Sequence, residues 1–208
     1  IKAPEGAMDV CGTGGDGLNT LNISTAVAFV VAACSVPVAK HGNRAVSSLS
    51  GSADIFAELG IDINITREKA EECLAKNNLV FLFAPNYHPA FKHVAQARKE
   101  LGLKTIFNYL GPLLNPAQVK YQLIGCHNIR MALRIASSSW SKSKNCVVVC
   151  GNDGMDEISI SDDSIILNRS LFEKDPIERI FNPEDFGFKK VPIAEIKGGS
   201  AKYNAEKL

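Results

Sequence analysis

The feature that most constrains this chain is the alternation of short apolar runs with helical patterns. Runs of strand length occur at residues 8–11, 36–39, 79–84, 104–108, 122–126 and 145–150. Helical patterns lie between or beyond them, at residues 22–35, 52–59, 66–77, 89–101, 129–140 and 201–208. Continuous apolar strands separated by helices are typical of a buried parallel sheet. The sequence therefore predicts one α/β domain over residues 1–208, with a largely parallel sheet flanked by helices.

Turn and cap residues set several of these boundaries. Thr66 is a plausible N-cap, Pro89 opens a helix at its first turn, and Gly60 and Gly102 end helices. The helix at 22–35 is apolar on nearly every side, which predicts that it is buried. The more polar segment 162–188 is assigned to no element.

Charge, cysteine content and apolar run length exclude several classes of protein. Lys and Arg number 23 against 22 Asp and Glu, so no global positive field favours nucleic acid or an anionic membrane. The longest apolar run, 26–34, is too short to span a bilayer. The six cysteines lack zinc-type spacing, and we expect them to be buried or half-buried thiols in the reducing cytoplasm. The chain begins without Met and stops inside a helical pattern, so we expect a piece of a longer protein.

Four polar clusters follow predicted strands, at residues 12–16, 40–44, 108–115 and 151–157. Ligands of α/β sheets gather beyond the carboxyl ends of the strands. We therefore expect the four clusters to form one composite site.

The first cluster is a glycine-rich loop that precedes the helix at residue 22. Glycines let the backbone approach a phosphate closely, and a helix N-terminus adds partial positive charge and free N–H donors. The loop has neither the P-loop nor the dinucleotide-binding spacing. In the alternative interpretation, the glycines only make a turn and Asn22 or Ser24 is only an N-cap.

The second cluster gathers Lys40, Arg44, an amide and several hydroxyls after a strand, a set that suits several phosphate oxygens at once. Its alternative is a solvated surface loop. The cluster at 151–157 contains the adjacent acids Asp156 and Glu157, which repel each other unless a cation neutralises them. Mg²⁺ fits, since it takes oxygen ligands and bridges to phosphates, although two loop acids are more often only solvated. Arg98, on the helix at 89–101, is by default a solvated helix arginine.

Taken together and in order, these motifs resemble the anthranilate phosphoribosyltransferase family. The matching strings are GTGGD at 12–16, NIST at 22–25, KHGNR at 40–44, SGSAD at 50–54, YHPA at 87–90, RKELG at 98–102, TIFN at 105–108, LGPL at 110–113, NP at 115–116 and DE at 156–157. The end of the chain, KGGS at 197–200 with NA at 204–205, also resembles the family, and the match covers nearly the whole sequence.

The resemblance implies a fold shared with the nucleoside phosphorylases, with a small helical domain beside a larger α/β domain. It implies that this chain holds the α/β domain with only remnants of the helical one. Family members transfer phosphoribose from phosphoribosyl pyrophosphate to the amine of anthranilate in tryptophan biosynthesis, with Mg²⁺, and are usually homodimers. No general acid or base is expected, because the attacking lone pair is already available.

The resemblance also implies site residues. Those for phosphoribosyl pyrophosphate are Gly12, Gly15, Asp16, Thr20, Asn22, Ile23, Ser24, Thr25, Lys40, His41, Gly42, Asn43, Arg44, Ala45, Val46, Ser47, Ser48 and Ser52. Those for anthranilate are Gly12, Asn43 and Arg98, where the guanidinium suits the substrate carboxylate. The magnesium ligands are Ser24, Asp156 and Glu157.

Two alternatives stay open at this stage. A pyrimidine nucleoside phosphorylase on the same fold would use free phosphate and would need no acidic metal pair, so Asp16 and the Asp156–Glu157 pair argue against it. A transferase-like paralogue that binds nucleic acid would be expected to carry a basic stripe, which a net charge of +1 does not support.

Overall fold

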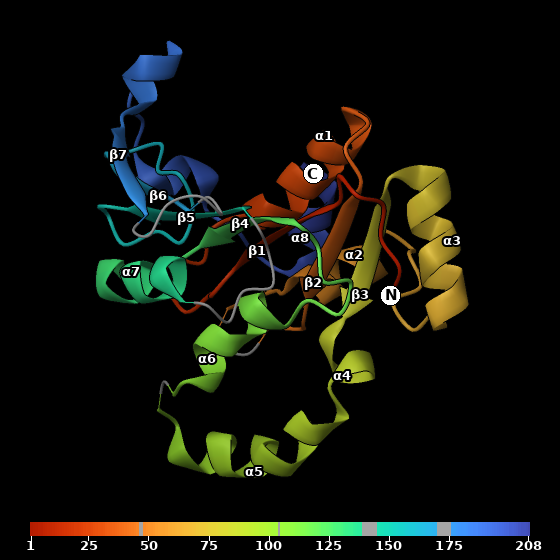
Figure 1. The fold of residues 1–208 in the computed structure, drawn as a ribbon. Helices are drawn as coiled ribbons and strands as arrows, with labels where there is room; N and C mark the ends of the chain where they lie inside the picture. Colours follow the sequence, from red (N-terminus) through yellow and green to blue (C-terminus); the bar gives the residue numbers. More distant parts are fainter. Residues whose placement is uncertain (46–47, 104, 139–144, 170–175) are drawn as a thin grey trace.

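The computed structural model of the chain describes residues 1–45, 48–103, 105–138, 145–169 and 176–208 (Figure 1). Within these ranges one mixed sheet runs in the order β3-β2-β1-β4-β5-β6-β7. Its strands are β1 (Met8–Gly12), β2 (Val38–Gly42), β3 (Leu79–Phe83), β4 (Tyr121–Gly125), β5 (Asn145–Gly151), β6 (Ser164–Arg169) and β7 (Ile177–Phe181). The first five strands are parallel, and β6 and β7 add to the edge in antiparallel pairing. The predicted α/β fold with a largely parallel sheet is confirmed.

Helices cover both faces of this sheet. The helices of the described residues are α1 (Ile23–Ala33), α2 (Ser52–Glu58), α3 (Arg67–Asn77), α4 (Ala84–Tyr87), α5 (Lys92–Leu101), α6 (Phe107–Leu110), α7 (Ile129–Ser137) and α8 (Ala201–Lys207), with 3-10 turns η1 (Pro89–Phe91), η2 (Gly111–Leu114), η3 (Pro183–Phe186) and η4 (Ile193–Ile196). Successive strand side chains point to opposite faces, so Val10 packs with α1 while its neighbour Cys11 packs with α7. In Figure 1, α5 stands apart from the sheet at the bottom of the view.

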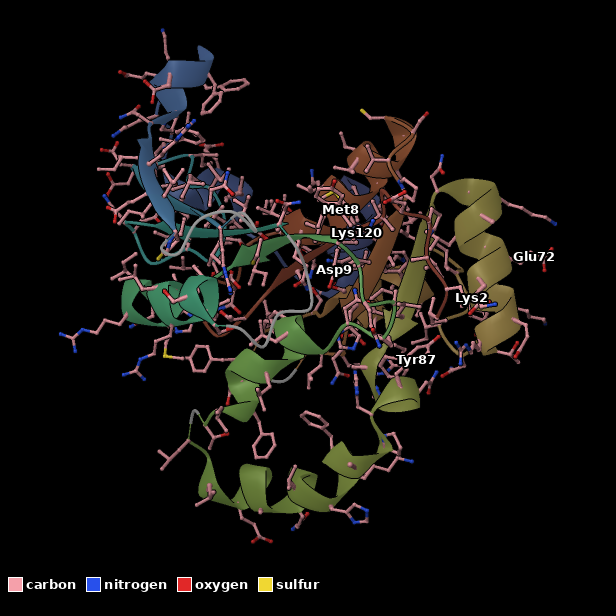
Figure 2. All side chains as sticks on the ribbon, in the orientation of Figure 1. Lys2, Met8, Asp9, Glu72, Tyr87 and Lys120 are labelled. Atoms are coloured by element: carbon pink, nitrogen blue, oxygen red, sulfur yellow. The ribbon has the colours of Figure 1, made fainter. Side chains whose placement is uncertain are left out.

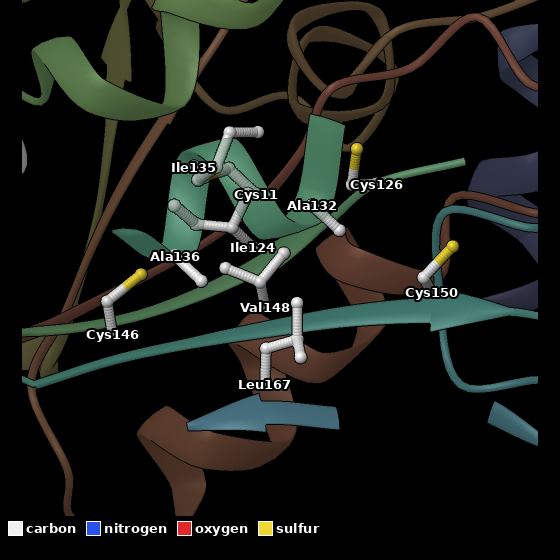
Figure 3. Close-up of a cluster of buried hydrophobic side chains, with 10 residues drawn as sticks. All are labelled: Cys11, Ile124, Cys126, Ala132, Ile135, Ala136, Cys146, Val148, Cys150 and Leu167. Carbon is white, nitrogen blue, oxygen red and sulfur yellow. The ribbon is translucent and has the colours of Figure 1, made fainter. Parts of the chain in front are cut away.

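The largest buried apolar cluster lies between the sheet and α7 (Figure 3). Ile124 and Val148, from the adjacent strands β4 and β5, have no exposed surface and pack against Ala132 and Ala136 of α7. Small alanines on the helix let its axis approach the sheet closely. This packing fixes the two strands whose carboxyl ends carry part of the site described below.

The order of the strands creates a switch point between β1 and β4. The chain moves from β1 to β2 and β3 on one side, and then returns to β4 and β5 on the other. The connections after β1 and β4 therefore diverge, and in open α/β sheets ligands bind beyond the carboxyl ends of the strands at such a switch point. The strand order thus favours the carboxyl ends of β1 and β4 as the place for a ligand.

Most predicted boundaries are confirmed. The hydroxyl of Thr66 accepts a hydrogen bond from the backbone N–H of Lys69 at 3.4 Å and so caps α3. Gly60 and Gly102 end α2 and α5 in the left-handed conformation, with φ of +75° and +59°. The helix predicted at 129–140 ends earlier, at Ser137 with Ser138 extended, and residues 139–144 lie outside the described residues.

The predicted strand at 104–108 is wrong. Residues Phe107–Leu110 form α6, and Lys104 lies outside the described residues. The Asn108 side chain accepts from the N–H of Thr105 at 2.9 Å, a local bond that favours a helical turn over a ladder. The polar cluster at 108–115 therefore begins inside α6 and does not follow a strand, and its Gly111–Leu114 part is a 3-10 turn.

Two burial predictions also need correction. Helix α1 faces the sheet with one side only, through Thr25, Ala28 and Ala32, whereas Val30 is 63% exposed. Of the six cysteines, none forms a disulfide and Cys34 is exposed, against the expectation that all are at least half-buried. The segment left unassigned at 162–188 supplies β6 and β7. No helix in the described part of the chain is long and apolar enough to cross a membrane.

Candidate active site

The glycines that end β1 and β4 make room for the acidic loop that follows β5. Gly12 and Gly125 are direct partners in the parallel pairing of these strands. A Cβ on Gly12 would lie 2.5 Å from Oδ2 of Asp156, and a Cβ on Gly125 would lie 1.6 Å from the carbonyl oxygen of Asp156. The N–H of Gly14 donates to Asp156 Oδ2 at 2.7 Å. The glycine loop and the acidic loop, 142 residues apart in sequence, are therefore in direct contact.

The acidic pair is buried at this end of the sheet, where its carboxylates are costly to ionise. Burial, and next the charge of Asp16, raise the pKa of Asp156 to about 6. Burial, and next the charge of Asp156, raise the pKa of Glu157 to about 8, although the backbone N–H of Ser24 donates to that carboxylate. Three carboxylates from two loops thus face one another, and their ionised forms are unfavourable without a nearby cation.

The nearest fixed cation is Lys40, which lies inside the protein. The residue is 1% exposed, and its ammonium donates to the carbonyl of Val10 at 2.6 Å and to the hydroxyl of Ser24 at 3.1 Å. Burial lowers its pKa, while attraction to Asp9, Glu157 and other acids opposes that shift. Lys40 therefore supports the site from beneath and orients Ser24, and its ammonium is turned away from solvent.

Helix α1 begins beside the acidic pair without a side-chain cap. Asn22 is at the N-cap position, but its carboxamide makes no capping hydrogen bond. Its Nδ2 instead donates to the carbonyl of Ser50 at 3.2 Å, and its Oδ1 accepts from the Ser50 hydroxyl at 3.0 Å. The interpretation of Asn22 as only a helix cap is therefore wrong, and the side chain links the loops that follow β1 and β2.

The loop after β2 is folded onto the start of α2. Arg44 pairs with Asp54 at 2.8 Å, and the second oxygen of this carboxylate accepts the N–H groups of Ala45 and Gly51. A Cβ on Gly51 would lie within 2.7 Å of the backbone of this loop, so only glycine permits the approach. The structure describes Asn43, Arg44, Ala45, Ser48 and Ser52 here, whereas Val46 and Ser47 lie outside the described residues.

His41 points to the other side of the sheet from Lys40. Its Nδ1 lies 3.2 Å from the carbonyl of Gly111 and its Nε2 lies 3.2 Å from Nε2 of His88. Burial, and next the proximity of His88, lower its pKa to about 4. His41 is therefore neutral at physiological pH, so the string KHGNR supplies two cations and, between them, a neutral imidazole.

The side-chain oxygen atoms at the start of α1 and in the acidic loop fit Mg²⁺ chemically. Ser24, Asp156 and Glu157 present a hydroxyl and two carboxylates, which are hard ligands of the kind that this ion takes while keeping several waters. The raised pKa values of both acids show that their ionised forms are unfavourable as they stand, and a bound cation would stabilise those forms. Among the described residues no group of three or more His, Cys, Asp or Glu side chains has a metal-binding arrangement. A site of this kind would therefore use water and substrate oxygens for its remaining ligands.

The structure brings the glycine loop at 12–16 beside the acids of the 151–157 cluster, and Lys40 of the 40–44 cluster beside Ser24, whereas the 108–115 cluster meets the other side of β2 through Gly111 and His41. Several residues that the motifs left unassigned also belong to this network. Asp9, at the centre of the molecule in Figure 2, is fully buried and accepts the N–H of His41 at 3.1 Å. The sequence signal that could have identified Asp9 is the presence of an acid inside an apolar strand. Ser50 and Asn204 gave no comparable signal, because their roles depend on contacts between distant segments.

The comparisons with known proteins agree with this geometry. The family model described as "Glycosyl transferase family, a/b domain" matches residues 4–208. The chain therefore belongs to this glycosyl transferase family, in its α/β domain. Within it, the sequence is similar to anthranilate phosphoribosyltransferases, so the resemblance drawn from the motifs is confirmed.

Two of these relatives are bacterial. The anthranilate phosphoribosyltransferase of Petrotoga mobilis is 51% identical over 200 residues, which are 95% of this chain and 57% of that protein. The one from Dehalococcoides mccartyi strain 195 is 46% identical over 99% of this chain and 60% of that protein. The chain thus spans about three fifths of the length of these relatives.

Two solved structures have the same fold. Anthranilate phosphoribosyltransferase from Thermus thermophilus superposes with a TM-score of 0.89 at 36% identity, over 100% of this chain and 61% of that one. The enzyme from Saccharomyces cerevisiae, solved in complex with PRPP and Mg, gives 0.90 at 30% identity over 99% of this chain and 57% of that one. The predicted kinship of the fold with phosphoribosyltransferases is confirmed.

Proposed function

We propose that this chain transfers the phosphoribosyl group of phosphoribosyl pyrophosphate to the amine of anthranilate, in tryptophan biosynthesis. The observation that carries the proposal is the convergence of the glycine loop, the start of α1 and the Asp156–Glu157 pair at the switch point of the sheet. The names of the relatives favour this reaction over the nucleoside phosphorylase and the nucleic-acid-binding alternatives. Residues 1–208 are proposed to form the α/β domain that binds phosphoribosyl pyrophosphate.

In the proposed reaction, the nitrogen of anthranilate forms a bond to the anomeric carbon of the ribose. The bond from that carbon to pyrophosphate breaks, the bonding pair leaves with pyrophosphate, and the amine loses a proton to solvent. Bound Mg²⁺ would offset the charge on the departing pyrophosphate. The protein's own part is to position both substrates and to exclude water, with no residue assigned as a general acid or base.

The glycine loop and the N-terminus of α1 are proposed to hold the phosphates, since both offer backbone N–H donors. The N–H of Gly14 is already engaged by Asp156, so a phosphate and this carboxylate compete for it unless a cation draws the carboxylate away. This competition is the physical reason to expect that phosphoribosyl pyrophosphate and Mg²⁺ bind together. Two yeast structures, one with PRPP and Mg and one with 4-fluoroanthranilate, support this choice of ligands.

The test is replacement of the acidic pair in the complete product of the gene. Asp156→Ala with Glu157→Ala should lower transferase activity by about 100-fold or more at saturating Mg²⁺, because charge stabilisation of the leaving group is lost. Without Mg²⁺ the thermal midpoint should stay equal or rise, because mutual repulsion is removed. Unchanged activity would contradict the proposed metal role, whereas a lower midpoint would show that the acids are structural.

Location in the cytoplasm and homodimer formation stay predictions. The proposed ligands are small molecules, and neither nucleic acid nor membrane is among the proposed partners.

A further inference from the structure

The end of the chain closes over the two loops that face the proposed phosphate site. The N–H of Leu21 donates to the carbonyl of Ile196 at 2.8 Å, and the N–H of Gly198 donates to the carbonyl of Asn19 at 2.8 Å. A Cβ on Gly198 would lie 2.3 Å from the carbonyl oxygen of Thr20, so only glycine permits this pairing. Residues 196–198 are therefore fastened to the chain that enters α1.

Asn204 of α8 completes this attachment from inside the protein. It is 1% exposed, and its Nδ2 donates to Oδ1 of Asn22 at 2.8 Å and to the hydroxyl of Ser50 at 2.9 Å. Its Oδ1 accepts the N–H of Gly199 at 2.7 Å. Every polar atom of this buried carboxamide thus has a partner, which is the condition under which a buried amide stabilises one arrangement.

The hydrogen bonds among Asn22, Ser50 and Asn204 join three segments that are distant in sequence. Asn22 ends the loop after β1, Ser50 ends the loop after β2, and Asn204 lies on α8. Asn22 makes two hydrogen bonds to Ser50, and Asn204 bonds to both of them. We call these three residues the amide cluster. Their geometry fixes the separation of the two loops, since moving either loop breaks several buried hydrogen bonds at once.

We propose that Asn204 and Ser50 are positioning residues for phosphoribosyl pyrophosphate, which hold the loops after β1 and β2 at the separation that the bound substrate requires. The inference rests on the proposed function and adds α8 to the binding machinery. Neither residue contacts the substrate in this proposal, because their polar atoms are used within the protein. If the cluster is broken, the loops sample other separations, and the apparent dissociation constant rises by the inverse of the binding-competent fraction.

The experiment measures binding of phosphoribosyl pyrophosphate in saturating Mg²⁺ by calorimetry, for the wild type, Ser50→Ala, Asn204→Ala and the double variant. Each single variant should weaken binding about tenfold, which is the size expected when a buried hydrogen-bonding partner is lost. The double variant should be little weaker than either single one, because the two residues act as one unit. Lys202→Ala, an exposed change on the same helix, is the matched control and should bind like the wild type.

The stoichiometry and the thermal midpoint separate positioning from folding. A purely structural role would lower the midpoint or the number of binding sites and leave the dissociation constant of the folded molecules unchanged, which would overturn the inference. Single variants within twofold of the wild type, or effects that multiply in the double variant, would overturn it as well. If the wild type itself binds no phosphoribosyl pyrophosphate, the proposed function fails and the inference fails with it. Ser50→Ala leaves α8 unchanged, so this variant alone can test the inference if Asn204→Ala does not fold.

Discussion

Lys40 and His41 are neighbours on β2, yet they meet opposite electrostatic surroundings. Alternation along the strand sends the ammonium toward Ser24 and the acids, and sends the imidazole toward Gly111 and His88. The two residues therefore have separate roles, although they are adjacent in a single polar motif. Lys40 compensates negative charge, and His41 is a neutral buried group.

The pKa of His41 predicts a pH dependence of stability. The pKa is lowered to about 4 in the folded state from 6.5, so the unfolded state binds the proton more tightly. The stability that depends on a neutral His41 is therefore complete above pH 6.5, and it is lost as the pH falls toward 4 because the unfolded state then takes up the proton. Between pH 7.5 and pH 5.0 this should cost the wild type about 2 kcal/mol of unfolding free energy relative to His41→Asn.

Urea unfolding of both proteins at the two pH values checks this prediction. The comparison between proteins removes the carboxylates, which both share and whose raised pKa values act in the opposite direction. Equal pH dependence in the two proteins would show that His41 is not held neutral by the fold.

Arg98 lies on α5, but its side chain lies outside the described residues, so its role stays a prediction from the resemblance. If its guanidinium binds the carboxylate of anthranilate, Arg98→Ala should cost about 2–4 kcal/mol, seen as a raised KM for anthranilate at nearly unchanged kcat. Arg98→Lys should recover part of the loss. Lys92→Ala on the same helix is the control. Anthranilate kinetics within twofold of the wild type would support a solvated arginine instead.

The sequence was a better guide to which residue types stand near the proposed site than to the directions of their side chains. The glycines and the Asp156–Glu157 pair were identifiable because each has a chemical reason to stand at a strand end, whereas the role of Ser24 was implied only by the resemblance. The directions of the Lys40 and Asn22 side chains were not predictable, because they depend on packing against distant segments. Asn204 was recognised only as part of a family string, and its contacts with Asn22 and Ser50 span 182 and 154 residues.

At the scale of elements, the strands ending in Gly12 and Gly125 determine how closely the acidic loop approaches. Gly125→Ala would place a Cβ 1.6 Å from the carbonyl oxygen of Asp156, so the loop after β5 must move. We expect a loss of about 2–4 kcal/mol in unfolding free energy and loss of magnesium-dependent binding. Gly111→Ala is the matched control, since its φ of −49° suits any residue and a Cβ there meets no atom within 4 Å.

Chemical denaturation and a magnesium titration of the two glycine variants test this account. If Gly125→Ala binds phosphoribosyl pyrophosphate as tightly as Gly111→Ala does, close approach of the acidic loop to β4 is not required for the site.

Element type was predictable where apolar periodicity and caps agree, as for α3, and failed where they are weak. Residues 104–108 have the composition of a strand, but the Asn108 side chain and the turn that follows favour α6. Strand β6 pairs on both sides, but its apolar run is limited to residues 165–167 inside a polar segment, whereas the edge strand β7 is almost wholly exposed and carries no continuous apolar run. Edge strands need only one paired side, so their sequences show a weak pattern.

At the scale of the whole molecule, the central claim is that the strand order brings three loops together at the carboxyl ends of the parallel strands. Only the crossing from β3 back to β4 beside β1 brings the glycine loop and the acidic loop together. Alternation of strands and helices predicted the fold class, but the strand order is a long-range property that periodicity does not encode. The shared site was expected from the rule for parallel sheets, and the contact between Gly14 and Asp156 supports it.

The most direct test is calorimetric titration of this chain with phosphoribosyl pyrophosphate, once in Mg²⁺ and once in excess chelator, with Glu157→Gln as the variant. The account predicts one binding site per chain in Mg²⁺, and strongly weakened binding both in chelator and in Glu157→Gln. Binding of equal strength with and without Mg²⁺, or unchanged binding by Glu157→Gln, would contradict the claim that the loops after β1 and β5 form one magnesium-dependent phosphate site.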